Sequence, residues 1–283
     1  MKYYIVDAFT DEPFGGNPAG VVMLGENVPF PSDKVMQQVA AELRFPETAF
    51  VQQNGPADFS IRYFTPCSQV ELCGHATIAS FGLLRRQGIV ADGTVCRNHT
   101  LAGDLEVKVA SQVMMQMAQP RVIVPLLDID YLHDIMAGMN RVEWNDLPVE
   151  VISTGLPDII MPVGSVESLN SLKPDMDALT ELSRELNVVG VHAFAMGDDG
   201  YTAHVRNFAP LYGVPEESAT GTANAALNYY LYRRNLVKYD QECHFMQGEV
   251  MQRPSVIVTV LGDDDTVYVG GQSAIVASGN LLI

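Results

Sequence analysis

The chain has 283 residues and twice as many acidic as basic side chains, 34 Asp and Glu against 17 Lys and Arg, giving a formal net charge of −17. This length suggests about two domains, and 47% hydrophobic with 18% charged residues is typical of a globular protein rather than a disordered one. The acidic balance, without any cluster of Lys and Arg, argues against nucleic acid and against an anionic membrane surface as partners.

The N-terminal residues reach Asp7 before any apolar run develops, so a signal peptide is not expected. No apolar stretch approaches the roughly 20 residues of a membrane-spanning helix. We therefore expect a cytoplasmic protein with no membrane partner. Its four cysteines form no Cys-x-x-Cys pair, so neither a zinc ribbon nor a disulfide framework is predicted.

In the first half of the chain, short strands alternate with two helices. Ser32 is placed to cap a helix whose apolar residues recur at helical spacing between residues 35 and 43. A second helix begins at Gly74, is apolar on nearly every side and ends at Gly88, a pattern that indicates a buried helix. Strands rich in Val, Ile, Tyr and Phe are predicted at residues 3–6, 20–24, 49–51, 59–64 and 105–109.

The second half follows the same plan. An amphipathic helix starts near Pro174, and a second Ala-rich, apolar helix starts at Gly221. A buried helix among many short strands predicts a sheet that wraps around it, hence an α+β fold with two similar units. Strands are predicted at residues 159–163, 255–260 and 266–269.

Parts of the sequence recur once, at nearly constant offsets. Arg, Phe and Pro of residues 62–66 recur in residues 206–210 at an offset of 144. Residues 74–79 align with residues 221–226 at an offset of 147. Gly16 and Pro18 match Gly155 and Pro157 at an offset of 139. Offsets that hold over blocks and drift slowly indicate a duplicated domain. The junction is expected near residue 120.

Both buried helices begin at a glycine followed by a small or polar residue. Glycine lets a ligand approach backbone N–H groups closely, and a helix N-terminus carries about half a positive charge, so such an end can bind a carboxylate. Gly74 and Gly221 could instead serve close helix packing. Two such helix starts in duplicated domains are expected to face one small-molecule site between the domains.

Three polar residues are not duplicated. Glu47 maps to Val191, His75 maps to Thr222, and Glu217 maps to Val70. An unmatched carboxylate on an otherwise symmetric scaffold is a candidate acid/base group, although a lone Glu is also a common surface residue.

Five blocks of the sequence, in this order along the chain, carry a family resemblance: residues 7–19, 47–50, 64–66, 73–77 and 220–223. They resemble the PhzF family of phenazine-biosynthesis isomerases. The resemblance extends from Asp7 to Gly271 and implies the diaminopimelate-epimerase fold, in which each of two pseudosymmetric domains has a mixed sheet around a central helix. We therefore expect an N-terminal domain at 1–119, completed by a C-terminal strand at about 272–283, and a C-terminal domain at 120–271.

The resemblance also implies a reaction and roles for the site residues. It is a cofactor-free isomerisation of a small carboxylic acid, in which Glu47 resembles the general acid/base and His75 the histidine that hydrogen-bonds the substrate. Glu217 stands where the family usually has Asp, and Thr222 where it has Ser. The backbone amides of Gly74, Gly221 and Thr222 would hold the substrate carboxylate, and a homodimer is the family expectation.

Two other functions stay open at this point. An amino-acid racemase of the same fold uses a cysteine at each helix start, but here Cys73 occupies the first position and Thr220 the second. A metabolite-binding protein that has lost turnover is the other alternative. No metal is expected, because the histidines show no ligand spacing.

Overall fold

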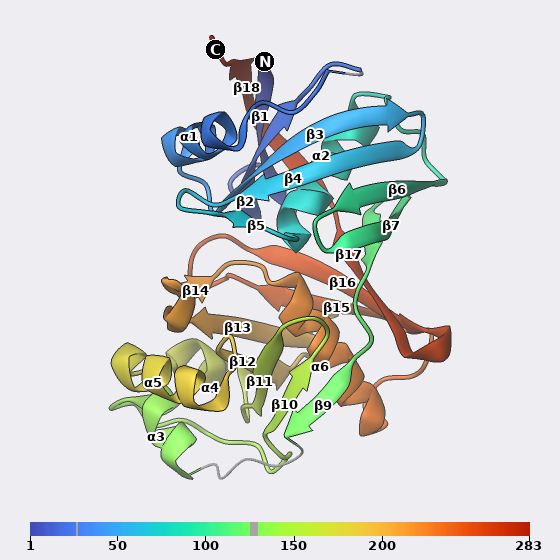
Figure 1. Cartoon of the computed structure of the whole chain (residues 1–283). Helices are drawn as coiled ribbons and strands as arrows, with labels where there is room; N and C mark the ends of the chain where they lie inside the picture. Colours follow the sequence, from blue (N-terminus) through green and yellow to red (C-terminus); the bar gives the residue numbers. More distant parts are fainter. Residues whose placement is uncertain (27, 125–129) are drawn as a thin grey trace. The chain divides into compact units, whose positions relative to one another are not determined.

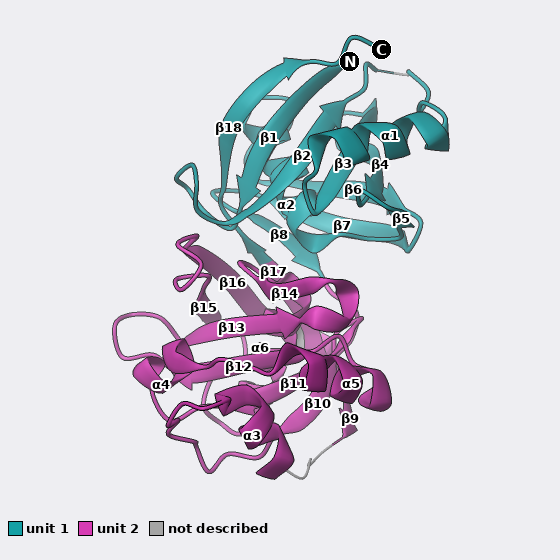
Figure 2. Cartoon of the chain, turned by 90° about the vertical axis from the view of Figure 1, so that its left-hand side faces the viewer, with its two compact units in different colours: residues 1–116, 270–283 teal, residues 117–269 magenta. Residues whose placement is uncertain are grey.

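The structure is a computed structural model that describes residues 1–26, 28–124 and 130–283. The chain divides into two compact units (Figure 2). Unit 1 comprises Met1–Gln116 and Gly270–Ile283, and unit 2 comprises Met117–Val269. The sequence-based boundaries lie at 119/120 and 271/272.

Unit 1 wraps a mixed sheet around one long buried helix, α2 (Figure 1). The C-terminal strand β18 returns to pair antiparallel with β1, so both ends of the chain lie in this unit. Its elements are β1 (Lys2–Ala8), β2 (Asn17–Met23), α1 (Asp33–Leu43), β3 (Glu47–Gly55), β4 (Asp58–Phe64), β5 (Gln69–Val70), α2 (Gly74–Arg86), β6 (Thr94–Thr100), β7 (Gly103–Val109), β8 (Val113–Gln116) and β18 (Ser273–Asn280).

Unit 2 places strands around a second buried helix, α6, and adds the smaller helices α3, α4 and α5 outside the sheet. Its elements are β9 (Arg121–Val124), α3 (Asp130–Ala137), β10 (Glu150–Ser153), β11 (Pro157–Pro162), α4 (Val166–Ser171), α5 (Met176–Leu186), β12 (Val191–Met196), β13 (Ala203–Ala209), η1 (Pro210–Tyr212), β14 (Val214–Glu217), α6 (Gly221–Arg233), β15 (Glu242–Gln247), β16 (Ser255–Gly262), η2 (Asp263–Asp265) and β17 (Thr266–Gly271).

The two units share one pattern of strand pairing. In unit 1, β2 pairs parallel with β3, β3 antiparallel with β4, and β4 parallel with β6. In unit 2, β11 pairs parallel with β12, β12 antiparallel with β13, and β13 parallel with β15. A 13-residue central helix occupies the corresponding place in each series, α2 between β5 and β6 and α6 between β14 and β15. The predicted α+β fold with two pseudosymmetric units is therefore confirmed.

Local sequence signals account for the helix boundaries. Ser32 caps α1, as predicted, and its Oγ accepts a hydrogen bond from the Val35 N–H. The predicted helix near Pro174 is α5, which Asp175 caps through the N–H groups of Asp177 and Ala178. Helix α2 is buried from residue 75 to residue 84 and ends two residues before Gly88, whose positive φ of 70° suits glycine.

Candidate active site

In unit 1, three side chains that can move or hold protons meet at the start of α2. Glu47 is the first residue of β3, and its Oε2 lies 3.2 Å from Nε2 of His75, in the first turn of α2. Cys73, the N-cap residue, places Sγ 3.5 Å from His75 Nδ1. The His75 side chain is 7% exposed and that of Glu47 is 20% exposed, so the carboxyl group is partly reachable and the imidazole is not.

Asn17 determines which ring nitrogen of His75 carries the proton. Its Nδ2 lies 3.4 Å from His75 Nδ1 and can only donate there. With Nδ1 accepting, the proton of the neutral ring is on Nε2, from which it is donated to the Glu47 carboxylate. Burial lowers the pKa of His75 to about 4, so the ring is neutral near pH 7. The pair is therefore a carboxylate held by a neutral imidazole donor.

A buried chain of hydroxyl groups holds the start of α2. Thr77 donates its hydroxyl to the Cys73 carbonyl at 2.7 Å and shares a hydrogen bond of the same length with the Tyr63 hydroxyl. Asn98 donates to that same Tyr63 oxygen at 3.0 Å. These bonds join β4, β6 and α2, and they position the turn from which Cys73 and His75 project.

Gly74 has open space where a side chain would begin. No described heavy atom other than its chain neighbours lies within 4 Å of a Cβ built at this position. Close helix packing therefore does not explain this glycine, whereas access of a ligand to the first-turn amides does. Cys73 accepts no side-chain capping bond from the first turn of α2.

The same three side chains also form a possible ligand set for a metal ion. The ligand atoms of Glu47, Cys73 and His75 all lie within 4.8 Å of one another, and thiolate, imidazole and carboxylate are the donors that zinc takes. The positive end of α2 opposes a cation at this place. The sequence-based expectation of no metal stays a prediction.

In unit 2, the start of α6 carries a carboxylate and a hydroxyl in contact. Thr220 is the N-cap residue of α6, and its hydroxyl donates to Glu217 Oε2 at 2.6 Å. Gln247, the last residue of β15, donates to the Glu217 carbonyl at 2.8 Å and accepts from the Thr220 N–H at 3.1 Å. Glu217 is thus held at the strand-to-helix turn, as the resemblance implied for a site residue.

The other two predicted residues of unit 2 begin α6 itself. Gly221 is buried, and Thr222 follows it in the first turn with its carbonyl accepting from the Thr154 hydroxyl at 2.9 Å. Each unit therefore gathers its own predicted residues at one helix start. The expectation that both helix starts act on one substrate stays a prediction.

Sequence reasoning did not select Asn17 and Gln247. Asn17 is 2% exposed and Gln247 is fully buried, and both orient site residues through hydrogen bonds. Asn17 lies in the block Gly16-Asn17-Pro18, where a polar residue at the beginning of a strand could have drawn notice. Gln247 has no comparable signal, because its role depends on where β15 ends.

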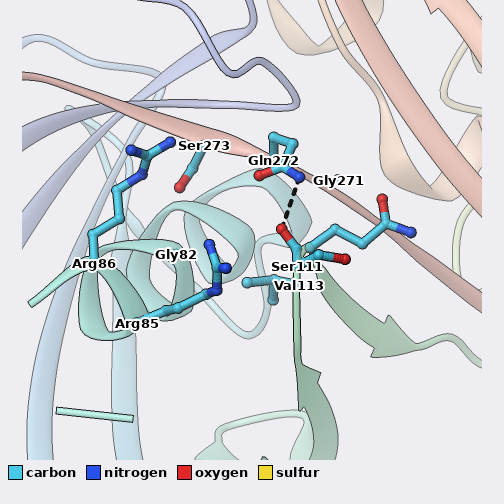
Figure 3. A pocket seen from close by; sticks show the side chains of 9 residues that line it. Gly82, Arg85, Arg86, Ser111, Val113, Gly271, Gln272 and Ser273 are labelled. Carbon is cyan, nitrogen blue, oxygen red and sulfur yellow. Dashed lines mark hydrogen bonds between the residues drawn. The ribbon is translucent and has the colours of Figure 1, made fainter. Parts of the chain in front are cut away.

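A separate small hollow in unit 1 lies along the C-terminal half of α2, away from His75 (Figure 3). Gly82, Arg85 and Arg86 line one side, and Gln272 bridges the other by donating to the Ser111 carbonyl at 2.7 Å. The carboxylate of Asp92 already engages Arg85 at 2.6 and 3.0 Å. The hollow has no acid/base group comparable with the start of α2.

Among the helices outside residues 27 and 125–129, none has the length and apolar character needed to cross a membrane.

The proteins that this chain resembles include several that are named as isomerases. Over 99% of this chain and 97% of its own length, an uncharacterised isomerase of Clostridium acetobutylicum is 32% identical. The trans-2,3-dihydro-3-hydroxyanthranilate isomerase of Pseudomonas fluorescens is 29% identical over 90% of this chain and 88% of its own length. A PhzF-family protein of Bacillus anthracis shares the fold with a TM-score of 0.87 and 24% identity, over 100% of this chain and 99% of that one.

The model of the phenazine biosynthesis-like protein family, PhzC-PhzF, matches residues 6–279. The chain therefore belongs to this family, and its enzyme class is that of the isomerases.

Proposed function

We propose that this protein moves a proton between carbon atoms of a small cyclic or amino carboxylic acid, without a cofactor, and that Glu47 takes and returns that proton. The contact between Glu47 Oε2 and His75 Nε2 at 3.2 Å carries the proposal. The relative from Pseudomonas fluorescens, named as an isomerase of a dihydro-hydroxyanthranilate, supports the substrate class.

The chemistry needs one base that can both remove and return a proton, and hydrogen-bond donors for the charge that develops on the substrate. Glu47 supplies the base. Its carboxylate is held by a neutral imidazole rather than an imidazolium, so it is not neutralised by a full ion pair. Once Glu47 carries the substrate proton, His75 Nε2–H is free to donate to the developing oxyanion or enolate.

The substrate carboxylate is assigned to the helix starts. The open space at Gly74 leaves room for it at α2, where first-turn amides and the helix dipole favour an anion. In unit 2, Gly221 and Thr222 present the corresponding turn of α6, and Glu217, held by Thr220, would contact a substrate amine or hydroxyl.

A racemase that uses two thiols is the main alternative enzyme. Cys73 is present beside His75, but Thr220 supplies a hydroxyl that already donates to Glu217. A hydroxyl is a far weaker acid than a thiol and cannot serve as the second base near neutral pH. The third reading, a binding protein without turnover, predicts ligand binding without proton exchange.

The test follows hydrogen-to-deuterium exchange at carbon by proton NMR in D2O, with trans-2,3-dihydro-3-hydroxyanthranilate and both proline enantiomers as probes. The wild type is expected to exchange or isomerise the first probe, also after EDTA treatment. Glu47→Gln is expected to lower that rate by about 10²–10⁴. Glu42→Gln, an exposed site on α1, is the matched control and should keep the full rate.

Three outcomes would contradict the proposal. Full turnover in Glu47→Gln removes Glu47 from the mechanism. Loss of turnover on chelation, restored by Zn²⁺, replaces the cofactor-free reaction with a metal-dependent one. Exchange at Cα of proline, but not in dihydro-hydroxyanthranilate, would assign the protein to the racemases.

A further inference from the structure

Unit 2 contains a buried carboxyl group that has no part in the function proposed above. Asp158 is the second residue of β11 and is 1% exposed. Its neighbours Ile159 and Met161 belong to the apolar cluster that includes Leu169 and Leu179 of the outer helices. Because side chains alternate along a strand, Asp158 lies on the other face, the one that packs against α6. Neither of its carboxyl oxygens meets a hydrogen-bond donor in favourable geometry within the described part of the chain.

Backbone groups fix the directions of the hydrogen bonds around the start of α6. The Thr220 N–H must donate, so the Gln247 atom at 3.1 Å is its amide oxygen. The Gln247 nitrogen accordingly donates to the Glu217 carbonyl at 2.8 Å. Asn224 Nδ2 lies 2.8 Å from the Thr220 carbonyl and 2.9 Å from the Gln247 oxygen. Both of these atoms accept, so the Asn224 amide orientation is fixed as well.

The same reasoning fixes the hydrogen-bond directions at His192 and Asn207. With its nitrogen used, Asn224 presents Oδ1 to His192 Nε2 at 3.3 Å, so His192 carries a proton on Nε2. Burial lowers the pKa of His192 to about 3, so the ring is neutral and Nδ1 accepts. Asn207 Nδ2, 3.2 Å away, donates to it. Asn207 Oδ1 is then left without a donor among the described residues.

Asn207 is the donor that favours a charged Asp158, because a hydrogen bond from its amide lowers the pKa of the carboxyl group. The Nδ2 group has two hydrogens, so it can donate to His192 and face Asp158 at once. Its geometry toward either Asp158 oxygen is unfavourable, so this donor does not offset the cost of burying a carboxylate. A proton on Asp158 removes that buried charge.

The charges around β11 favour the neutral acid. Burial first, and then the negative charge of Glu217, raise the pKa of Asp158 to about 8. Among the described residues, Glu217 on β14 is the titratable group that acts on Asp158, and His192 on β12 is hydrogen-bonded to Asn207 at 3.2 Å. Glu150, on the neighbouring strand β10, is paired with Arg233 at 2.8 Å and with Arg234 at 3.0 Å.

We propose that Asp158 is a protonated carboxylic acid in the native protein near neutral pH, so that Glu217 has no second negative charge beside it at the start of α6. Asp158 is thus a positioning residue that acts through Glu217. Its loss of a proton in alkaline solution would place that second charge near the amides proposed to bind the substrate carboxylate.

The duplicated sequence supports a special role for this side chain. The offset of 139 that matches Pro18 with Pro157 also pairs Ala19 with Asp158. In unit 1 the corresponding position of β2 is apolar, and Ala19 lies beside Glu47 in the strand register. Glu47 of unit 1 therefore has no carboxyl counterpart in unit 2, and Asp158 and Glu217 of unit 2 have none in unit 1.

The first test reads the protonation state directly. Infrared difference spectra of the wild type between about pH 6 and pH 10 should show a carboxylic-acid C=O band that disappears at high pH. The band should shift with carboxyl-¹³C aspartate labelling. It should be absent from Asp158→Asn and retained in Asp198→Asn, the control at an exposed carboxylate of unit 2. A wild type without an aspartic-acid band at about pH 6 overturns the proposal, even where Asp158→Asn fails to fold.

The second test is the pH dependence of stability. The native protein holds a proton that the unfolded chain releases above the ordinary pKa of Asp, 3.8. Stability is therefore lost as pH rises from that value to the folded pKa of about 8. Relative to Asp158→Asn, the folding equilibrium constant of the wild type should fall by about tenfold per pH unit in this window. Parallel curves for the two proteins would refute the proposal.

The consequence for catalysis rests on the proposed function and is tested separately. Exchange by the wild type should fall above about pH 8 while exchange by Asp158→Asn does not, and an identical alkaline fall in both contradicts the assigned role of Asp158. The infrared and stability readouts use no substrate, so failure of the proposed reaction would leave them standing.

Discussion

Removal of the Arg206 guanidinium should destabilise unit 2 far more than the same change at the repeated position of unit 1. Arg206 lies on β13 with 7% of its side chain exposed, and it forms two 2.8 Å hydrogen bonds with the two carboxylate oxygens of Glu216. It also donates to the Leu169 and Leu172 carbonyls at 3.0 and 2.9 Å. These carbonyls belong to the end of α4, so the guanidinium joins strand, helix and carboxylate.

The size of the effect follows from the burial of both partners. Arg206→Met keeps an unbranched side chain but leaves Glu216, only 16% exposed, without its partner. Breaking a buried ion pair by removing one partner costs about 3–5 kcal/mol, and the loss of the donations to the Leu169 and Leu172 carbonyls keeps the expectation within that range rather than below it. Arg206→Met with Glu216→Leu should recover much of the loss, because an apolar pair leaves no buried charge.

Arg62 provides the matched control, since it occupies the equivalent position in unit 1. Its side chain is 23% exposed, and its carboxylate partner Asp33 is 71% exposed at 2.8 Å. Exposed ion pairs contribute little, so Arg62→Met should destabilise the protein by a small fraction of the Arg206→Met effect.

Urea unfolding measures this difference when it is followed by far-UV circular dichroism, which reports both units, and by tryptophan fluorescence, which reports unit 2. Trp144 is the only tryptophan of the chain and stacks on His133, with ring centroids 3.9 Å apart. Its fluorescence therefore reports unit 2 without assuming that both units unfold together. If Arg206→Met shifts the free energy of unfolding no more than Arg62→Met, or if Glu216→Leu adds a further loss, the reasoning about buried charge is wrong.

Two further predictions concern Cys73 and His204. Cys73→Ala should change the exchange rate by less than about tenfold, since no proton passes through it, whereas a true acid/base costs about 10²–10⁴; abolished exchange in Cys73→Ala with tolerated Glu47→Gln would favour a thiol racemase. Burial alone would lower the pKa of His204, but hydrogen bonds to Glu249 at 2.7 Å and Asp199 at 3.1 Å outweigh it and raise that pKa above its ordinary 6.5. The folded protein thus holds this proton more tightly than the unfolded chain, so its stabilisation is complete below pH 6.5 and disappears as pH rises through the folded pKa. Trp144-monitored unfolding of wild type and His204→Gln should converge with rising pH, and curves that diverge would contradict the raised pKa.

Local patterns in the sequence predicted the elements whose cause is local. Ser32 begins α1 because a hydroxyl before an apolar periodic segment satisfies a backbone N–H. The apolar residues around the whole circumference of α2 predicted a helix buried on all sides. Strand β18 is different: its sequence, SAIVASGN, is rich in small residues, and its pairing with β1 depends on a contact across the whole chain. Only the family resemblance pointed to it.

The candidate site likewise contains residues that the sequence predicted and residues that it did not. Glu47 and His75 were selected because duplication left them unmatched, and the structure places their side chains in contact. Asn17, Gln247 and Asp158 were not selected. Their roles depend on hydrogen bonds and electrostatic interactions between elements far apart in sequence, and a single polar residue at a strand end carries no periodic signal.

The position of β18 has a consequence for the order of synthesis on the ribosome. Unit 2 is contiguous, from Met117 to Val269, whereas unit 1 needs a strand that is translated after all of it. Until Ser273–Asn280 emerges from the exit tunnel, β1 keeps one long edge without its final partner, and such edges invite association with other chains. Unit 2 can thus complete its fold first, although it comes second in the chain. A chain truncated after Gln272 should therefore have a protease-resistant unit 2 and a unit 1 that is still open to cleavage.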